Sequence, residues 1–413
     1  MITQLKHIIF AMLIGIPIIA KSTILEVCQA CEIKSIEKAV QYSESYDTLM
    51  LAPEDFVVSN LEIKHPLVIV GDKGTILDGN EEGYILKILS DSVHISGLNL
   101  INAGRSFTKD FAAIYVSRSS VFSITNCEII EPYFGILIEK SHHGLIRNNH
   151  VYGSMEIESD AGNGIHLWHS SHIQIQDNEL HGMRDGIYFE FVTDSQIERN
   201  YSYDNIRYGL HFMFSNDDEY YDNRFRDNGA GVAVMFSKNI IMKRNEFAFN
   251  WGSASYGLLL KEIYDAEVEF NKFEQNTIGI FLEGSTRINY KNNSFISNGW
   301  AVKVSGGCYK NVFNKNDFIS NSLDVSYNSK MNDNLFEGNY WSEYNGYDLD
   351  KNGEGDVPYR PVKLFSYIVS TTPESIVLLR SLFIDILNFS ERISPIFTPD
   401  DLQDTLPSMQ PCQ

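Results

Sequence analysis

The chain has 413 residues, 43% of them hydrophobic, and a formal net charge of -21 at pH 7. This charge argues against nucleic acid and anionic membrane surfaces as partners, because both would repel an acidic protein. It is compatible with cationic ligands, although acidic surfaces commonly serve solubility alone. The length could hold two or three domains, but a repeating solenoid would add its coils to one continuous core.

The N-terminus predicts an exported protein. Lys6 precedes an apolar run over residues 8–20, and the chain beyond it fits signal-peptide cleavage near Ala20 or Ser22. The run is shorter than the roughly 20 apolar residues that span a bilayer, so an uncleaved anchor is the second interpretation. We therefore assign residues 1–22 to a signal peptide.

Two of the five cysteines, Cys28 and Cys31, form a C-x-x-C pair just after the expected cleavage site. In an oxidising compartment such a pair predicts a small disulfide. The alternative is a soft-metal or redox pair with free thiolates. The sequence leaves both interpretations open.

The next segment predicts a short helix over residues 35–42, followed by strands over 48–51, 67–70 and 75–78. A helix lying over the first coil would cap the otherwise open end of a stack of strands. Less regular coils continue over residues 94–99, 113–116 and 121–127.

From residue 135 to residue 295 one pattern returns seven times: a Gly, then alternating apolar residues, then an Asn fourteen residues after the Gly. The pairs are Gly135/Asn149, Gly164/Asn178, Gly186/Asn200, Gly209/Asn223, Gly231/Asn245, Gly257/Asn271 and Gly279/Asn293. Alternation of apolar and polar residues is the period of a β-strand. A unit of about 22 residues is also too short for a pair of packed helices.

The repeat therefore predicts an all-β fold, a right-handed parallel β-helix in which each coil of about 22 residues contributes three short strands. We expect each repeated Asn to occupy a turn position that tolerates left-handed backbone. Stacked coil on coil, these Asn side chains should form a hydrogen-bonded ladder.

One outward face of the coils is unusual. Residues two and four after each Gly point away from the core, and in the middle coils they are His166, Trp168, Tyr188, Glu190, His211, Met213, Ala233 and Met235. Residues in the same phase of successive coils lie about 4.8 Å apart. Thioether and imidazole groups at that spacing could bind one soft ion such as Cu(I). The alternative is an apolar patch, including Trp168 and Tyr188, that is covered by a partner.

Several acidic residues are candidates for a catalytic pair. A β-helix with clustered carboxylates can cleave or epimerise polysaccharides. Asp217, Asp218, Glu219 and Asp222 fall in one turn and the next strand, where a solvated run is expected, and Asp185 is interpreted as a single turn residue. Because no column pairs carboxylates with a basic residue, the sequence does not favour an enzyme.

Near the C-terminus, acidic and amide residues alternate around Gly353, similar to the first part of a calcium loop. They are Asp348, Asp350, Asn352, Glu354 and Asp356. The bidentate Glu expected at the twelfth position is replaced by Tyr359. Either a weak Ca²⁺ site or a metal-free turn fits this segment.

Residues 373–393 predict one helix with apolar residues around most of its circumference, among them Leu378, Leu382, Phe383 and Leu387. Such a helix must be buried. Charged residues interrupt it, so it is a poor membrane span. Either it docks on a membrane partner or it folds back onto the β-helix. The last residues, rich in Pro, Asp and Gln, look like an extended arm.

Several motifs together resemble the NosD family of periplasmic β-helix proteins, which are required to mature nitrous oxide reductase. They are GNGIHLW (residues 162–168), RDGIYFE (184–190), YGLHFMFS (208–215), GVAVMFS (231–237), NYWS (339–342) and GDVPYRP (355–361). The likeness extends over nearly the whole mature chain. The coil repeat itself is shared with polysaccharide-acting β-helix proteins, whereas the His/Met coils and the C-terminal segment are specific.

The resemblance implies a non-enzymatic periplasmic assembly factor that helps to deliver copper. It implies three partners: an ABC transporter with permease and ATPase subunits, a copper chaperone lipoprotein, and nitrous oxide reductase. The permease, engaged by the C-terminal helix, would give the protein its membrane association. His211, Met213 and Met235 match the family's coil motifs, while His166, Cys28 and Cys31 are weaker candidates for copper.

These features divide the chain into a signal peptide (1–22), a β-helix with an N-terminal cap (23–361), and a C-terminal helix with an extended arm for docking (362–413). The alternative function is that of a secreted β-helix protein that binds or cleaves polysaccharide. A groove floored by two or more carboxylates and an Arg or Lys would favour that alternative.

Overall fold

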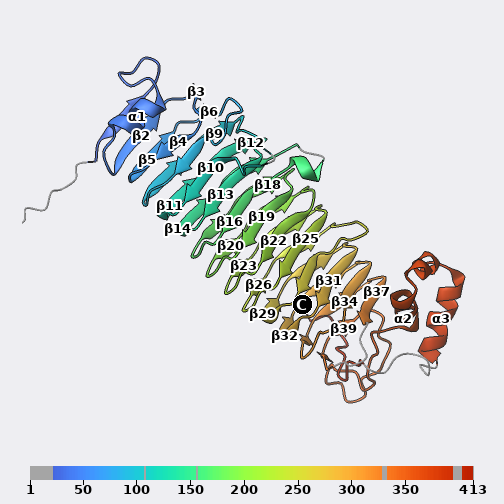
Figure 1. Ribbon diagram of the computed structural model, residues 1–413. Helices are drawn as coiled ribbons and strands as arrows, with labels where there is room; N and C mark the ends of the chain where they lie inside the picture. Colours follow the sequence, from blue (N-terminus) through green and yellow to red (C-terminus); the bar gives the residue numbers. More distant parts are fainter. Residues whose placement is uncertain (1–21, 107, 155–156, 328–332, 394–401, 413) are drawn as a thin grey trace, which may run out of the picture.

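The computed structural model describes residues 22–412 apart from 107, 155–156, 328–332 and 394–401, so nearly all of the predicted signal peptide lies outside the described residues. The described chain winds into a parallel β-solenoid with three sheets of 14, 12 and 13 strands. The strands stack side by side into one elongated body (Figure 1). The predicted parallel β-helix is confirmed.

The three sheets are named here by their order within a coil. The first contains β1 (Ile24–Val27), β2 (Asp47–Leu51), β5 (Leu67–Gly71), β8 (Val93–Ser96), β11 (Ser120–Thr125), β14 (His142–Arg147), β17 (Gln174–Gln176), β20 (Gln196–Glu198), β23 (Glu219–Tyr221), β26 (Ile241–Lys243), β29 (Tyr264–Glu269), β32 (Thr286–Lys291), β35 (Val312–Asn314) and β38 (Leu335–Glu337).

The second sheet contains β4 (Leu61–Ile63), β7 (Leu86–Ile88), β10 (Ala112–Ser117), β13 (Phe134–Glu139), β16 (Ile165–Trp168), β19 (Asp185–Glu190), β22 (Tyr208–Met213), β25 (Ala230–Met235), β28 (Leu258–Lys261), β31 (Ile278–Glu283), β34 (Trp300–Val304) and β37 (Leu323–Tyr327). This sheet carries the unusual outward face.

The third sheet contains β3 (Asp55–Val57), β6 (Ile76–Asp78), β9 (Asn99–Ile101), β12 (Glu128–Ile130), β15 (His150–Tyr152), β18 (Glu179–His181), β21 (Tyr201–Tyr203), β24 (Arg224–Arg226), β27 (Glu246–Ala248), β30 (Lys272–Glu274), β33 (Ser294–Ile296), β36 (Asp317–Ile319) and β39 (Tyr340–Trp341). A 3-10 turn, η1 (Glu158–Asp160), lies in the insertion that follows β15.

The core is a set of columns of identical or similar side chains. One column stacks rings from Phe225 to Trp341, with centroid separations between 4.1 Å and 5.6 Å; its members are Phe225, Phe247, Phe273, Phe295, Phe318 and Trp341. Each ring is buried, and offset stacking adds to the energy of burial. Register is fixed because a slip of one residue would turn these rings to solvent.

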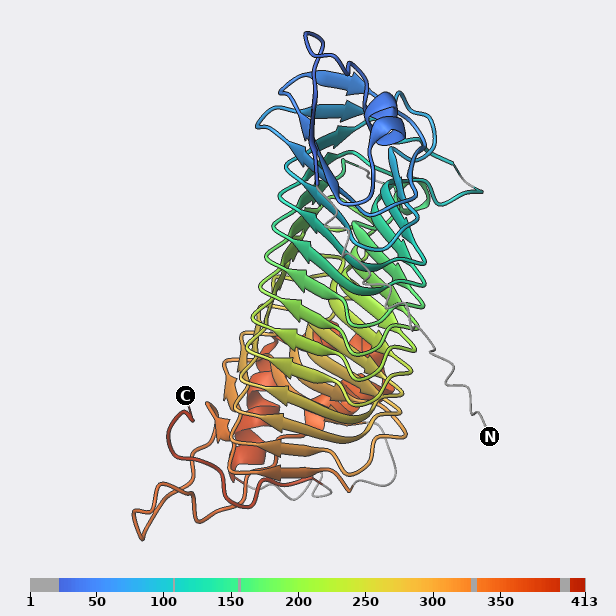
Figure 2. The same cartoon turned by 90° about the vertical axis from the view of Figure 1, so that its left-hand side faces the viewer.

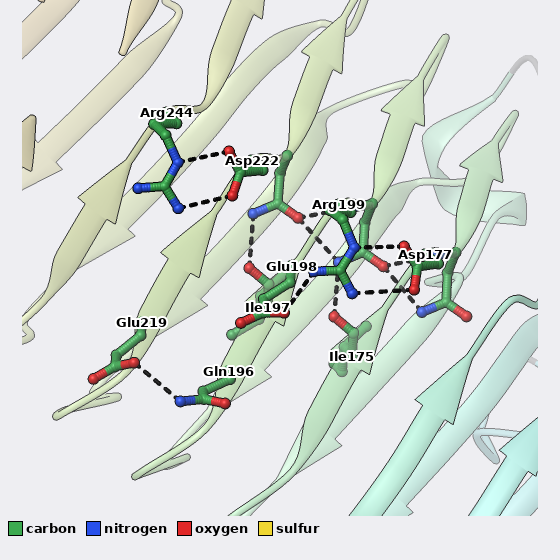
Figure 3. A network of polar contacts seen from close by, with 12 residues as sticks. Ile175, Asp177, Gln196, Ile197, Glu198, Arg199, Glu219, Asp222 and Arg244 are labelled. Carbon is green, nitrogen blue, oxygen red and sulfur yellow. Dashed lines mark hydrogen bonds and ion pairs between the residues drawn. The ribbon is translucent and has the colours of Figure 1, made fainter. Parts of the chain in front are cut away.

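The predicted Asn ladder is also present. In each coil from Asn149 to Asn316, the backbone N–H and Nδ2 donate to Oδ1 of the Asn in the next coil, over 2.9–3.1 Å. Ion pairs such as Arg199–Asp177 and Arg244–Asp222 flank the ladder on its outer side (Figure 3). The expectation that the Asn itself adopts left-handed backbone is wrong. The left-handed residue is the one before it, as in Asp177 with φ 56° and Arg199 with φ 53°.

The N-terminal end carries the expected helix. The helix α1 (Ile36–Tyr42) begins at Ser35, whose side chain accepts a hydrogen bond from the backbone N–H of Lys38. Its residues Ile36 and Ala39 are buried in the main core, so the helix covers apolar groups of the first coils (Figure 2).

The C-terminal helical segment differs from the single predicted helix. It consists of α2 (Leu364–Thr371), the 3-10 helix η2 (Pro373–Leu378) and α3 (Leu382–Ile393). The helix is interrupted because residues 379–381 turn with 3-10 bonds, and Ser381 then accepts a hydrogen bond from the Ile384 N–H at the start of α3. Among the described residues, none of the helices has the length and apolar character needed to cross a bilayer.

The end of the chain closes the last coil. Residues 402–412 return to β38 and β39, where Asp404 and Ser408 form β-bridges with Phe336 and Tyr340. Asp404 is fully buried and occupies the next rung of the Asn ladder, since its Oδ2 accepts from the backbone N–H and Nδ2 of Asn339. This part of the predicted docking arm is therefore packed against the solenoid.

Candidate functional site

The central candidate lies on the outward face of the second sheet. Met213 of β22 and Met235 of β25 are direct register partners, and both are half-buried. His211 lies two residues before Met213 on the same strand, with only 5% of its surface exposed. The structure therefore places the three predicted copper ligands on two adjacent strands of the second sheet, as the repeat predicts.

The two ring nitrogens of His211 are unusual for a buried histidine. Neither has a hydrogen-bond partner within the described part of the chain. Its ring is held by aromatic contacts instead, edge-to-face with Tyr188 at 5.1 Å between centroids and tilted against Tyr208 at 4.7 Å. A buried polar atom without a partner costs free energy, and the lone pair of one of these nitrogens could bind a ligand.

Tyr188 joins the histidine to the methionines. Its hydroxyl lies 4.0 Å from Sδ of Met213, and the residue is the register partner of His211. Burial raises the pKa of Tyr188, with smaller contributions from Glu190 and Asp185, so the hydroxyl is protonated at neutral pH. The phenol therefore shields the thioether without adding charge.

His166 belongs to the same row but does not join the cluster. It pairs in register with Tyr188, which separates it from His211 by a whole coil. Burial lowers the pKa of His166 to about 4, with a further contribution from Arg184. Its Nδ1 lies 3.2 Å from Nδ2 of Asn163. The neutral ring could serve as a ligand, but not of the ion that His211 and Met213 would share.

Asp185 was missed by the sequence analysis. It is not a turn residue but the first residue of β19, and it is fully buried. Arg184 Nε and Arg207 Nε each lie 3.9 Å from its carboxylate, and His211 Nδ1 lies 3.8 Å away. Asp185 is a single carboxylate between two basic residues, not one of a pair, because its register partner in the next coil is Tyr208. The alternation of β19 puts Asp185 in phase with the core residues Ile187 and Phe189, which could have predicted its burial but not its partners from the next coil.

A second missed feature is a column of aromatic rings at the turn that follows each methionine position. The rings of His169, Phe191, Phe214 and Phe236 stack at 4.6–5.2 Å between centroids. Phe191 and Phe214 are 40% and 39% exposed. This stack lies directly beside Met213 and Met235 in the chain, and it forms an apolar rim along the methionine row.

Trp168, expected to take part in docking, lies at the N-terminal end of this rim. The ammonium of Lys140 lies 4.8 Å from its ring, and His169 packs against it at 4.4 Å. Trp168 is half-buried, so its ring is partly covered by residues of this chain.

Cys28 and Cys31 are joined in a disulfide after β1. A disulfide sulfur is not a thiolate, so the pair cannot bind copper in this state and the soft-metal interpretation requires its reduction. The structure therefore agrees with the disulfide alternative at the N-terminal end, many coils from Met213.

The acidic loop near Gly353 is closed by its own backbone. Asp348 accepts the N–H groups of Asn352 and Gly353 at 3.2 Å and 2.9 Å, and Asp356 accepts that of Leu349 at 2.7 Å. Asp350 accepts the side-chain amide of Asn352 at 3.2 Å. The Gly353 N–H lowers the pKa of Asp348, which keeps it a carboxylate without any cation. A calcium site is not supported by this arrangement, because the loop's own N–H groups already occupy oxygens of Asp348 and Asp356.

The predicted docking residues of the C-terminal segment point in two directions. Leu378, Leu382 and Phe383 are 44%, 74% and 60% exposed. Leu387 instead packs with Ile384 and Leu323 at the end of the second sheet. One side of the segment is thus folded back onto the solenoid, and the other presents large apolar side chains to solvent.

Within the described ranges, no three His, Cys, Asp or Glu side chains converge as a set of metal ligands. The donor set with His211 at its centre relies on two thioethers, which is the ligand chemistry of Cu(I) rather than of Zn²⁺ or Ca²⁺.

Comparison with known proteins identifies relatives over most of the chain. Residues 151–346 match the family described as NosD, periplasmic copper-binding protein. A probable ABC transporter binding protein NosD of Pseudomonas aeruginosa is 28% identical over 85% of this chain and 86% of its own length. The protein of the same name from Stutzerimonas stutzeri is 26% identical over 84% of both chains. The matched range includes His211, Met213 and Met235.

Solved structures with a similar fold include polysaccharide epimerases. The A-module of mannuronan C-5 epimerase AlgE6 of Azotobacter vinelandii superposes with a TM-score of 0.62 at 11% identity, covering 75% of this chain and 93% of that chain. A variant of the periplasmic alginate epimerase AlgG gives 0.53 at 12% identity, covering 70% and 76%. At this identity the likeness shows a parallel β-helix and nothing about chemistry.

Proposed function

Because this chain is a NosD-type protein, we propose that it is a periplasmic assembly factor that helps to deliver copper to nitrous oxide reductase. In this proposal it acts by binding rather than by catalysis, and it works with an ABC-type transporter in the inner membrane. Copper is its cargo.

The observation that carries the proposal is the group formed by His211, Met213 and Met235. Two thioethers in register and one imidazole with unpartnered nitrogens make a soft, neutral donor set. A neutral set binds Cu(I) without the thiolates that would hold it firmly. We expect the ion to be bound transiently and exchanged with an incoming ligand of the next protein.

The surroundings of this group support transfer through docking. The stack of Phe191, Phe214 and Phe236 gives an apolar rim beside the thioethers, in which Phe191 and Phe214 are exposed and Phe236 is half-buried. Apolar surface of this kind marks contact sites. We propose that the copper chaperone lipoprotein docks on this rim, with Trp168 and Tyr188 at its edge, and presents the ion to Met213.

The exposed side of the C-terminal segment supports docking on the transporter permease. Leu378, Leu382 and Phe383 would be covered there, whereas Leu387 holds the segment to the solenoid. Both relatives are named as ABC transporter binding proteins. In this arrangement membrane association passes through the permease.

The proposal is tested by complementation. In the native host with the gene deleted, nitrous oxide reductase is purified after expression of each variant, and its copper content is measured. Met213→Ala/Met235→Ala should leave the reductase copper-poor. The matched control is Met50→Ala/Met409→Ala, which removes two half-buried methionines outside the site and should restore full copper loading.

The C-terminal contact is tested in the same host by co-purification of the permease. Leu382→Lys/Phe383→Lys should abolish co-purification, while Val57→Lys, a 68% exposed apolar residue on β3 at the opposite end, should leave it intact. Full copper loading by the Met213→Ala/Met235→Ala protein would refute the copper role of this face, whatever the outcome for the permease.

A further inference from the structure

The buried carboxylate of Asp185 needs an explanation. Its residue is 0% exposed, and within the described part of the chain neither oxygen has a hydrogen-bond partner. Burying a carboxylate without compensation costs several kcal/mol. Folding keeps it there only if nearby groups offset that cost.

Three donors surround this carboxylate at nearly equal distance. Arg207 Nε lies 3.9 Å from Oδ1, while Arg184 Nε and His211 Nδ1 lie 3.9 Å and 3.8 Å from Oδ2. These separations are too long for hydrogen bonds but short enough for strong Coulomb attraction where little water is present. The carboxylate is therefore held by charge, in a cage that a shift of about 1 Å would convert into hydrogen bonds.

The position of the Asp185 carboxylate decides which ring nitrogen of His211 carries the proton. In a neutral imidazole one ring nitrogen carries the proton and the other carries a lone pair. A lone pair on Nδ1 would point toward a carboxylate oxygen 3.8 Å away and be repelled, whereas an N–H there is attracted. The proton is therefore favoured on Nδ1, which leaves Nε2 with the lone pair.

The other ring nitrogen of His211, Nε2, is the one that could bind a metal. It is buried and, among the described residues, has no hydrogen-bond partner, so its lone pair is not used by the fold. In metal sites a ligating histidine typically donates its other N–H to a carboxylate, which fixes the tautomer and orients the ring.

We propose that Asp185 is a positioning residue, which holds the proton of His211 on Nδ1 and so presents Nε2 to Cu(I) beside Met213. This inference rests on the proposed function for its copper part, but its tautomer part concerns the metal-free protein. Arg184 and Arg207 hold the carboxylate in turn.

A purely structural brace is the competing explanation. Arg207 also contacts Glu158 of η1 through Nη1 at 3.3 Å, so the same charges tie the insertion to the coils. A brace predicts that loss of Asp185 lowers stability without any effect on the ring nitrogens of His211.

The first test is nitrogen NMR of the metal-free protein labelled with ¹⁵N-histidine. His211→Gln assigns the resonances. We expect wild type to show the Nδ1–H tautomer and Asp185→Asn, which has the same shape, to shift His211 toward Nε2–H. Glu158→Gln is the matched control, because it removes a carboxylate from the other side of Arg207 and should leave the tautomer unchanged. An Nε2–H tautomer in wild type, or no change in Asp185→Asn, would overturn the proposal.

The second test is an anaerobic Cu(I) competition titration of the same proteins. Asp185→Asn should bind Cu(I) about 10–100-fold more weakly, as for other carboxylates behind a metal-binding histidine, and Glu158→Gln within about twofold of wild type. Equal affinity of Asp185→Asn and wild type would refute the positioning role even if copper delivery stands. Conversely, wild type could bind no Cu(I) while Asp185→Asn still shifts the His211 tautomer. That result would uphold the action of Asp185 on His211 and refute the proposed function.

Discussion

Asp404 offers the sharpest test of how the solenoid is closed. Its carboxylate lies 65 positions from Asn339 in sequence, yet it accepts hydrogen bonds from Gly338 N, Asn339 N, Asn339 Nδ2 and Trp341 Nε1 over 2.9–3.0 Å. Asn339 and Trp341 are 0% and 1% exposed. Asp404→Ala would therefore leave three buried donors without their acceptor: the backbone N–H and Nδ2 of Asn339 and Nε1 of Trp341.

The cost follows from those three donors. Each unsatisfied buried donor costs about 1–3 kcal/mol, so local stability should fall by about 3 kcal/mol or more. Coils of a solenoid depend mainly on their neighbours, so the loss should appear as fraying of the last coil rather than as global unfolding. Because about 1.4 kcal/mol is a factor of ten, amide exchange should accelerate roughly 100-fold.

Hydrogen exchange measured by mass spectrometry over residues 335–341 reads this effect directly, with residues 142–147 as an internal reference. Asp404→Asn is the informative partner, because an amide keeps one oxygen for the Asn339 and Trp341 side chains, as every other rung does. It should cost only about 1 kcal/mol. Unchanged exchange in Asp404→Ala, or equal acceleration in both variants, would refute the account of Asp404 as the terminal rung.

Three further predictions concern other parts of the chain. Burial raises the pKa of Asp324 to about 7, so the folded state holds a proton that the unfolded state loses near pH 4; stability should fall as pH rises from about 4 to 7, and Asp324→Asn should remove that fall in denaturant titrations. Cys28→Ser/Cys31→Ser should leave the Cu(I) stoichiometry of the oxidised protein unchanged, and a lost equivalent would move a site to the N-terminus. Leu387→Ala should release the C-terminal segment and increase its exchange, because that side chain packs against the second sheet, whereas Leu378→Ala, whose side chain is 44% exposed, should not.

The solenoid was predictable because its signal repeats. Gly135 to Asn293 gave seven copies of one unit, so errors in any single coil did not matter, and alternation fixed which side chains face inward. The same register placed Met213 beside Met235 without any knowledge of three-dimensional contacts. The predicted position of the left-handed backbone is off by one residue. Asn is common at such turn positions, but here its side chain hydrogen-bonds to the Asn of the next coil and the preceding residue is left-handed.

Other features depended on contacts that no repeat encodes. Asp185 was unremarkable in sequence, since only folding brings Arg207 and His211 from the next coil to its carboxylate. The return of Asp404 to Asn339 joins segments with no shared pattern. The division between η2 and α3 depends on a turn and a capping Ser381, which an apolar helical pattern conceals.

Anaerobic Cu(I) titration against a chromophoric chelator tests the central claim most directly. The protein without residues 1–22 is compared with Met213→Ala/Met235→Ala and with the control Met50→Ala/Met409→Ala. The account predicts one equivalent bound by wild type and by the control, and its loss in the variant without Met213 and Met235. Equal binding by all three proteins, or none by wild type, would contradict the assignment of copper to this face of the solenoid.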